Sequence, residues 1–173
     1  MKRLSSIAVI LLLSVSVLAG NGPKELEFCN TQIMPGTSKN ELYDKAYSWI
    51  KDFAERDGFP NQFSSGYNDF QVKYYVVKNG PNFGLPRWIP GGQDGTEISF
   101  YIAIKCRDGS YTARLFNIST MNPHFYAFYG ENGKLYPEMY NRKQIKNSIP
   151  ILEYISNLAD DIFLEIKEYM TGN

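Results

Sequence analysis

The chain has 173 residues, of which 43% are hydrophobic, and it carries 18 basic and 18 acidic side chains. A chain of this length forms one ordinary domain and has enough residues to bury a hydrophobic core. Nucleic-acid binding depends on clustered Lys and Arg, which release counterions from the phosphates, so the balanced charge argues against a nucleic-acid partner.

Residues 1–19 have the order of a secretory signal peptide: basic residues, then a largely apolar run from Ile7 to Leu18, then small residues. The run is too short for a membrane-spanning helix, which needs about 20 apolar residues. We therefore expect cleavage after Ala19, a single α+β domain over residues 20–173, and no membrane span in the mature protein. A bacterial lipoprotein would carry a cysteine just after the small residues, where this chain has Asn21. The sequence predicts a periplasmic or secreted protein without a lipid anchor.

The first part of the mature chain predicts a strand and a helix. Leu26 to Met34 has strand character, and Pro35-Gly36 ends it. In the following segment, SKNELYDKAYSWIKDFAERDG, Ser38 and Glu41 form an S-x-x-E capping box, in which each side chain satisfies a backbone N–H at the helix start. Apolar residues at steps of three and four then form a stripe that faces the core, namely Leu42, Ala46, Trp49, Ile50 and Phe53. Asp57-Gly58 ends the helix.

A second strand is predicted from Asp69 to Lys78, and a long loop follows it. The better candidates for the core in this strand are the even positions, Phe70, Val72, Tyr74 and Val76. The segment from Asn79 to Gly95 holds three prolines and five glycines, which excludes regular structure over most of it. A loop of this length in a compact domain is often functional.

The segment from Glu97 to Ser119 predicts two strands joined through Asp108-Gly109. Asp-Gly supplies the positive φ angles of a two-residue type I′ turn, and β-branched and aromatic residues crowd both flanks. Such a turn sets the cross-strand pairs Arg107–Ser110, Cys106–Tyr111, Ile104–Ala113, Ile102–Leu115 and Phe100–Asn117. Because side chains alternate along a strand, the inward face of the first strand carries Ile98, Phe100, Ile102, Ile104 and Cys106.

The last part of the chain predicts a shorter hairpin and a long helix. Phe125–Tyr129 and Lys134–Tyr136 flank Asn132-Gly133, a hairpin turn signal. The final helix has Ser148 as its cap and Pro150 in its first turn, where a missing N–H has no partner to lose. Its apolar stripe comprises Leu152, Ile155, Leu158, Ala159, Ile162, Phe163, Ile166 and Met170. The order of strand, helix, strands and helix predicts a two-layer α+β domain: a mostly antiparallel sheet with the two helices on one face.

Two motifs carry a resemblance to a known family: SKNELYDKAYSWI in the first helix and KCRDGSYTARLFNIS in the hairpin. With them, the chain resembles a bacterial domain-of-unknown-function family described as having a TBP-like fold, whose members are mostly exported. The matching helix positions are Ser38, Lys39, Leu42, Tyr43, Ala46, Trp49 and Ile50. The resemblance covers residues 26–119 and implies a TBP-like, helix-grip-like fold with no established activity. Thr112, followed by Arg114, departs from the family's pattern, and so does the proline-rich loop.

Catalytic and metal-binding side chains are few. The only histidine, His124, has no partner motif of a nucleophile or an acid beside it. One His with two separated Cys does not give a known metal spacing, so we expect no metal or other cofactor and no catalytic site. An export compartment permits a disulfide between Cys29 and Cys106. Against that bridge, Cys106 lies on an apolar strand face, where a free cysteine packs as a small hydrophobe.

The surplus of aromatic residues, 13 Tyr, 11 Phe and 2 Trp, gives the one indication of a working surface. The hairpin register puts Tyr101 opposite Phe116 on the face away from the helices, with Arg114 and Ile118 nearby. An apolar sheet face of this kind binds a ligand, binds a partner or is covered by a loop, here residues 79–95. The candidate ligand-binding residues are Tyr75, Trp88, Tyr101, Arg114 and Phe116.

Two functions lead, and an enzyme ranks third, which would need a cleft that holds His124 and a carboxylate within hydrogen-bond reach. The first is an exported, non-catalytic binding or interaction module for an unknown protein or small molecule, which uses the aromatic sheet face and the 79–95 loop. The alternative is a carrier that holds a hydrophobic small molecule between the sheet and the C-terminal helix.

Overall fold

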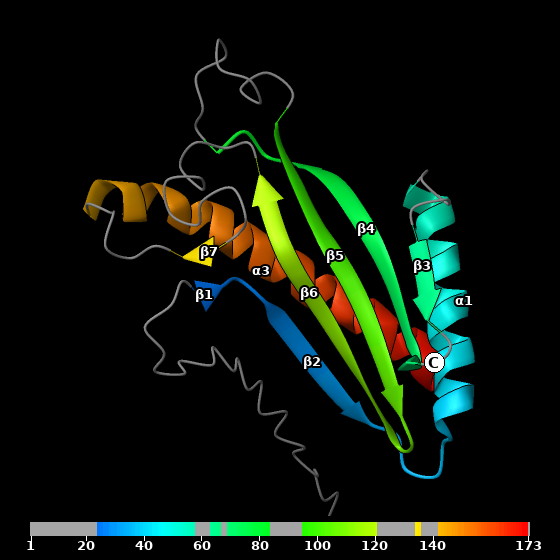
Figure 1. The fold of residues 1–173 in the computed structure, drawn as a ribbon. Helices are drawn as coiled ribbons and strands as arrows, with labels where there is room; N and C mark the ends of the chain where they lie inside the picture. The colour runs from blue at the N-terminus through cyan, green and yellow to red at the C-terminus, as the bar shows by residue number, and fades with distance from the viewer. Residues whose placement is uncertain are drawn as a thin grey trace, which may run out of the picture.

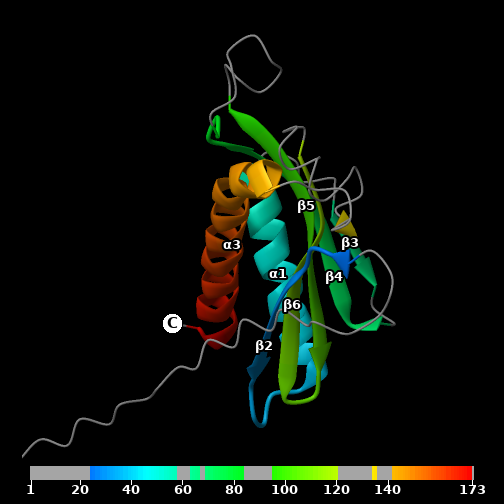
Figure 2. The same ribbon diagram turned by 90° about the vertical axis from the view of Figure 1, so that its left-hand side faces the viewer.

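The structure is a computed structural model that describes residues 24–57, 63–66, 69–83, 95–120, 134–135 and 142–172. In chain order its elements are β1 (Lys24–Glu25), β2 (Phe28–Ile33), α1 (Lys39–Asp57), β3 (Phe63–Gly66), β4 (Gln71–Gly80), β5 (Thr96–Arg107), β6 (Ser110–Thr120), β7 (Lys134–Leu135) and α3 (Arg142–Thr171). Five strands form an antiparallel sheet in the order β2-β6-β5-β4-β3 (Figure 1). Both helices lie on one face of this sheet (Figure 2). The predicted two-layer α+β fold is therefore confirmed.

The start of α1 is fixed by the hairpin turn as well as by its own cap. Ser38 Oγ accepts a hydrogen bond from the Glu41 N–H at 3.2 Å, as the capping motif predicts. Asp108 Oδ1, at the tip of the β5–β6 hairpin, accepts another from the Lys39 N–H at 2.9 Å. The Gly109 N–H donates to the Thr37 carbonyl at 2.9 Å. The turn thus holds the helix start through contacts between segments that are far apart in the chain.

The hairpin keeps the predicted register from its turn as far as Tyr101 and Phe116, and then slips by one residue. Asn117 has a positive φ of 52° at this β-bulge, so two residues of β6 lie opposite Phe100. The predicted Phe100–Asn117 pair is therefore wrong. Beyond the bulge the side chains of β6 change face. We expected Ile118 beside the aromatic residues of the outer face, and this is wrong: Ile118 is fully buried in the core.

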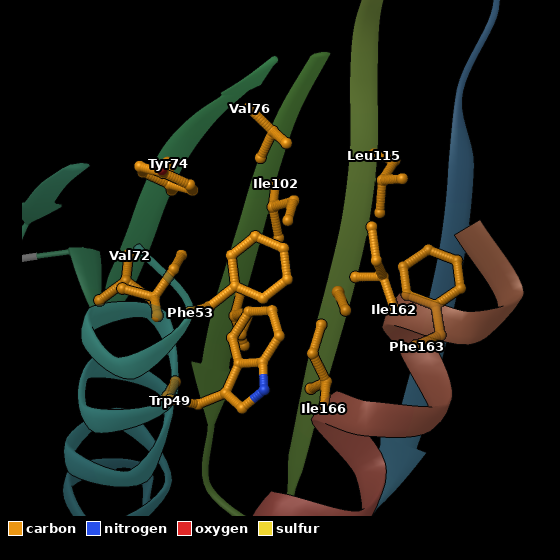
Figure 3. Close-up of a cluster of buried hydrophobic side chains, with 14 of the residues drawn as sticks. Trp49, Phe53, Val72, Tyr74, Val76, Ile102, Leu115, Ile162, Phe163 and Ile166 are labelled. Atoms are coloured by element: carbon orange, nitrogen blue, oxygen red, sulfur yellow. The ribbon is translucent and has the colours of Figure 1, made fainter. Parts of the chain in front are cut away.

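The core lies between the helices and the sheet (Figure 3). The predicted stripe of α1 is buried, together with Tyr43 and Ala54, which the sequence did not single out. The rings of Trp49 and Phe53 contact each other in a tilted arrangement, with 5.0 Å between centroids. The indole N–H of Trp49 donates to Glu165 Oε1 of α3 at 3.2 Å. This hydrogen bond links α1 to α3.

Two predictions about the C-terminal part are wrong. Helix α3 begins at Arg142, so Ser148 is not its cap, and Pro150 lies inside the helix. The proline ring has a helical φ and removes one backbone hydrogen bond, and the helix continues on both sides of it. Strand β7 pairs with β1. Phe125–Tyr129, the partner that the sequence predicts for it, lies outside the described residues, so the second hairpin stays a prediction. Neither of the two helices described has the length and apolarity that crossing a membrane requires.

Candidate functional site

The sheet surface that faces away from the helices, called here the outer face, carries a row of three aromatic rings. Tyr75 of β4 lies opposite Tyr101 of β5, which lies opposite Phe116 of β6. The ring centroids are 5.1 Å apart for Tyr75 and Tyr101, and 5.6 Å apart for Tyr101 and Phe116. All three side chains are half-buried. We call this row the aromatic band; it crosses the three central strands of the sheet.

Two cationic side chains lie against the aromatic band. Lys73 Nζ is 3.9 Å from the ring centroid of Tyr101 and 5.3 Å from that of Phe116. Arg114 Cζ is 5.2 Å from the centroid of Phe116. Both residues lie opposite Ala103, one on each side of β5, so the small alanine leaves room for them to lean over the rings. Contacts of this kind are favourable because a cation is attracted to the negative face of an aromatic ring.

The two cations differ in their charge partners. Arg114 donates two hydrogen bonds to Glu27, from Nε to Oε1 at 2.7 Å and from Nη2 to Oε2 at 2.6 Å. This bidentate contact holds the guanidinium in a fixed orientation and lowers the pKa of Glu27. Lys73 makes no ion pair with any residue that the structure describes. Of the two cations that lie against the aromatic band, Arg114 is therefore neutralised by Glu27, and the charge of Lys73 is available to a ligand.

Cys29 extends this cluster to the edge of the sheet. It lies opposite Arg114 in the register of β2 and β6, and its thiol donates a hydrogen bond to Glu27 Oε1 at 2.7 Å. Partial burial, and then the neighbouring carboxylate, raise the pKa of Cys29 to about 11. A thiol in this state is a poor nucleophile, because the thiolate is the reactive form. The arrangement fits a hydrogen-bonded structural thiol better than a catalytic one.

The structure brings together four of the five predicted site residues, Tyr75, Tyr101, Arg114 and Phe116. The fifth, Trp88, lies outside the described residues, and so does His124. Phe83, at the described start of the loop, contacts Tyr154 of α3 at 5.6 Å between centroids and thus packs on the helix side of the sheet.

Sequence reasoning missed Lys73 and Glu27. The signal for Lys73 was its parity with Tyr75 on one strand, which places both on the same face. The register that brings Lys73 to the β5 and β6 rings could not be read from the chain, because β4 and β5 are joined by the long loop.

Cys29 and Cys106 do not form the disulfide that the sequence allowed. Both are free, Cys29 exposed and Cys106 buried. Cys106 pairs with Tyr111 on the core face, whereas Cys29 pairs with Arg114 on the outer face, so the sheet itself separates the two sulfur atoms. Burial raises the pKa of Cys106 to about 12, which agrees with its role as a packed apolar side chain.

The space between the sheet and α3 is occupied by the protein's own core. The inward side chains of α3, Ile151, Ile155, Ala159, Ile162, Phe163, Ile166 and Met170, are at most 8% exposed and belong to the same cluster as the inward residues of β4, β5 and β6. A hydrophobic cargo held there would have to displace these contacts. The packing therefore favours the outer face over the carrier interpretation.

The comparison with known proteins rests on structure. No protein-family model matches the chain, and no curated protein matches it. A DUF4468 family protein from Bacteroides ovatus matches 86% of this chain and 90% of its own, with a TM-score of 0.56 and 14% identity. A TBP-like protein from Parabacteroides distasonis matches 83% of this chain and 93% of its own, with a TM-score of 0.54 and 17% identity.

The chain has a TBP-like fold. This is the fold that the helix and hairpin motifs predicted, and the neighbour from the domain-of-unknown-function class agrees with the resemblance drawn from them. At these identities the likeness concerns the TBP-like fold alone, and neither neighbour's name states an activity or a ligand. Any function must be argued from the side chains of this chain.

Proposed function

We propose that the protein is an exported binding module without catalytic activity, and that its ligand is bound on the outer face by the aromatic band with Lys73 and Arg114. The observation that carries the proposal is the aromatic band itself, three half-buried rings in contact across three strands, with two cations against them. The signal-peptide pattern predicted at residues 1–19 supports export. Trp88 and the rest of the 79–95 loop remain predicted contributors.

The geometry suits a ligand that has a flat or apolar group and a negative charge. Stacking on protein rings contributes about 1 to 3 kcal/mol for each ligand ring and does not depend on particular substituents of that ring. Because the rings stand on neighbouring strands of a sheet, their positions are set before the ligand arrives, which lowers the entropic cost of binding. The ammonium group of Lys73 then favours an anion beside the rings.

The proposal is tested with 1-anilinonaphthalene-8-sulfonate, an aromatic anion whose fluorescence rises when it binds an apolar surface. The wild-type mature chain should bind this probe in the folded state. Tyr101→Ala/Phe116→Ala should bind it at least about tenfold more weakly, because two stacking surfaces are lost. Lys73→Gln should lower the affinity for the sulfonate probe and leave the affinity for uncharged N-phenyl-1-naphthylamine unchanged. Amide shifts near Tyr101 and Phe116 in a nuclear magnetic resonance titration would locate the probe.

The matched control replaces two exposed apolar side chains of α3, Leu164→Ala/Tyr169→Ala, which lie on the opposite side of the molecule. It should bind the probe as the wild type does. Equal affinity in the wild type and in Tyr101→Ala/Phe116→Ala, with both proteins folded, would remove the outer face as the binding site. Export is tested separately: the protein secreted by a bacterial host should begin at Gly20 on N-terminal sequencing.

A further inference from the structure

Strand β2 ends the sheet and is paired on one side. It pairs with β6, and no other described strand lies beyond it, as Figure 1 also shows for the labelled elements. In a hairpin with a two-residue turn, the first pair, Arg107 and Ser110, is hydrogen-bonded, and hydrogen-bonded pairs alternate from there. It follows that β6 uses Tyr111, Ala113 and Leu115 to bond β2. The Met34 N–H, which donates to the Gly109 carbonyl at 2.8 Å, continues the same alternation.

The backbone groups on the free edge of β2 are therefore those of Cys29, Thr31 and Ile33. The side chains of these three residues are also exposed, and Ile33 is 70% exposed. Sheet edges are usually protected from pairing by a charged residue, a proline, a bulge or a covering element. The strand FCNTQI has neither a charge nor a proline, and its ladder with β6 runs without a register shift. In the part of the chain that the structure describes, none of these features protects the free edge of β2.

The chemistry of the strand identifies the partner, because it is symmetric about Thr31. In an antiparallel pair with a second copy centred on Thr31, Cys29 lies opposite Ile33 and Asn30 lies opposite Gln32. One position further out, Phe28 lies opposite Met34, so apolar groups meet apolar groups and amides meet amides. No two like charges face each other, since Glu27 lies opposite Pro35 and is bound by Arg114 of its own chain. Self-complementarity of this kind is what a two-fold interface requires.

We propose that the protein forms a two-fold dimer through β2, in which the edges of two copies pair as antiparallel strands across an axis at Thr31. Thr31, Cys29 and Ile33 then exchange backbone hydrogen bonds with the second copy. The axis is perpendicular to the sheet, so the two outer faces lie side by side on one surface of a continuous sheet. The dimer goes beyond the proposed binding function and does not depend on it. Because one strand pair buries a small area, the association should be weak and should depend on concentration.

The first test is sedimentation velocity of the mature chain, residues 20–173, over roughly a hundredfold range of concentration. The wild type should shift from monomer to dimer within the range, and Thr31→Lys should require at least tenfold higher concentration, because two ammonium groups then meet at the axis. The Thr31 side chain is exposed, and its hydroxyl makes a hydrogen bond with the hydroxyl of Thr112 at 2.9 Å. Thr112→Ala removes the same hydrogen bond without changing the edge and should dimerise like the wild type.

The second test is cysteine crosslinking, which traps even a weak dimer as a covalent product. In Cys29→Ser/Thr31→Cys the two new cysteines lie at a hydrogen-bonded pair, with about 5.5 Å between Cα atoms, a distance that a disulfide spans. Mild oxidation should link this variant into a dimer at least tenfold faster than Cys29→Ser/Lys51→Cys, whose cysteine is on the exposed face of α1.

The proposal would be overturned if the wild type stayed monomeric at every concentration and Cys29→Ser/Thr31→Cys crosslinked no faster than Cys29→Ser/Lys51→Cys. The edge would then be left to a different partner. A dimer that persists unchanged in Thr31→Lys would also overturn it, because the contact would then lie elsewhere on the molecule.

Discussion

Tyr74 and Tyr111, two buried tyrosines of the same sheet, differ in the hydrogen bonding of their hydroxyl groups. We therefore expect replacement by phenylalanine to change the free energy of unfolding in opposite directions. The hydroxyl of Tyr74 donates to Asp57 Oδ2 at 3.2 Å, and Asp57 also forms an ion pair with Lys78. The hydroxyl of Tyr111 has no hydrogen-bond partner in the part of the chain that the structure describes. Both side chains are at most 2% exposed. Replacement by phenylalanine removes the hydroxyl in each case and leaves the ring.

The expected magnitudes follow from the state of each hydroxyl. Burying a polar group without a partner costs about 1 to 3 kcal/mol, so Tyr111→Phe should raise the free energy of unfolding by about 1 kcal/mol. A hydrogen bond to a charged group contributes about 1.5 to 3 kcal/mol, so Tyr74→Phe should lower it by about 2 kcal/mol. The Asp57 side chain is 5% exposed, so water compensates little for the lost donor.

Urea unfolding followed by circular dichroism measures both changes, and an unchanged slope shows that the two states being compared are the same. Near-ultraviolet spectra of the two variants should match the wild type, which excludes a repacked core as the cause. A loss of more than about 0.5 kcal/mol in Tyr111→Phe would refute the reasoning, since it would mean that the hydroxyl is satisfied in the folded protein.

Two further predictions concern titratable groups. Burial raises the pKa of Cys106, Tyr74 and Tyr111 to about 12 in each case, above ordinary values of 9.0 for the thiol and 10.0 for the phenols. The unfolded chain therefore releases these protons at lower pH than the folded protein, so stability that is intact below pH 9 should fall as the pH rises towards 12. Cys106→Ala should delay the first part of this loss. Urea midpoints at rising pH measure the change, and a midpoint that stays constant to pH 11 would contradict it. Glu27→Gln should lower the pKa of the Cys29 thiol, because it removes the carboxylate and frees Arg114. Iodoacetamide should therefore modify Cys29 several-fold faster at pH 8, and the control Glu41→Gln on α1 should leave the rate unchanged. Equal rates in the wild type and Glu27→Gln would show that burial alone sets this pKa.

The local features of the fold were predictable where a short stretch carries its own signal. Asp108-Gly109 sets a two-residue turn whatever surrounds it, so the pairs from Arg107–Ser110 to Ile102–Leu115 follow from the sequence. The capping box at Ser38 is a signal of the same kind. The bulge at Asn117 is different, because asparagine tolerates a positive φ without requiring it, and packing of Ile118 into the core decides the conformation.

Apart from Tyr75 of β4, the candidate site was predictable only as far as that hairpin reaches. Tyr101, Arg114 and Phe116 lie on two strands joined by a tight turn, so their faces follow from alternation. Lys73 and Glu27 come from β4 and β2, whose registers are set by pairing between segments distant in the chain. The sequence therefore indicated an aromatic surface, and the cation available to a ligand emerged only from the structure.

The aromatic band has a structural role as well, and the two roles predict different results. Cross-strand aromatic pairs contribute about 0.5 to 1.5 kcal/mol each beyond their burial, so the Tyr75–Tyr101 and Tyr101–Phe116 contacts stabilise the sheet whether or not a ligand binds. If that were their whole purpose, phenylalanine at Tyr75 and Tyr101 would serve as well, and Lys73 would be free to change. If the band also binds a ligand, the charge of Lys73 matters. Lys73→Gln should then change the free energy of unfolding by no more than about 1 kcal/mol, as for other exposed cation–aromatic contacts, and should still lower the affinity for an aromatic anion. The comparison of these two measurements on one variant separates a surface that only holds the sheet together from one that also binds.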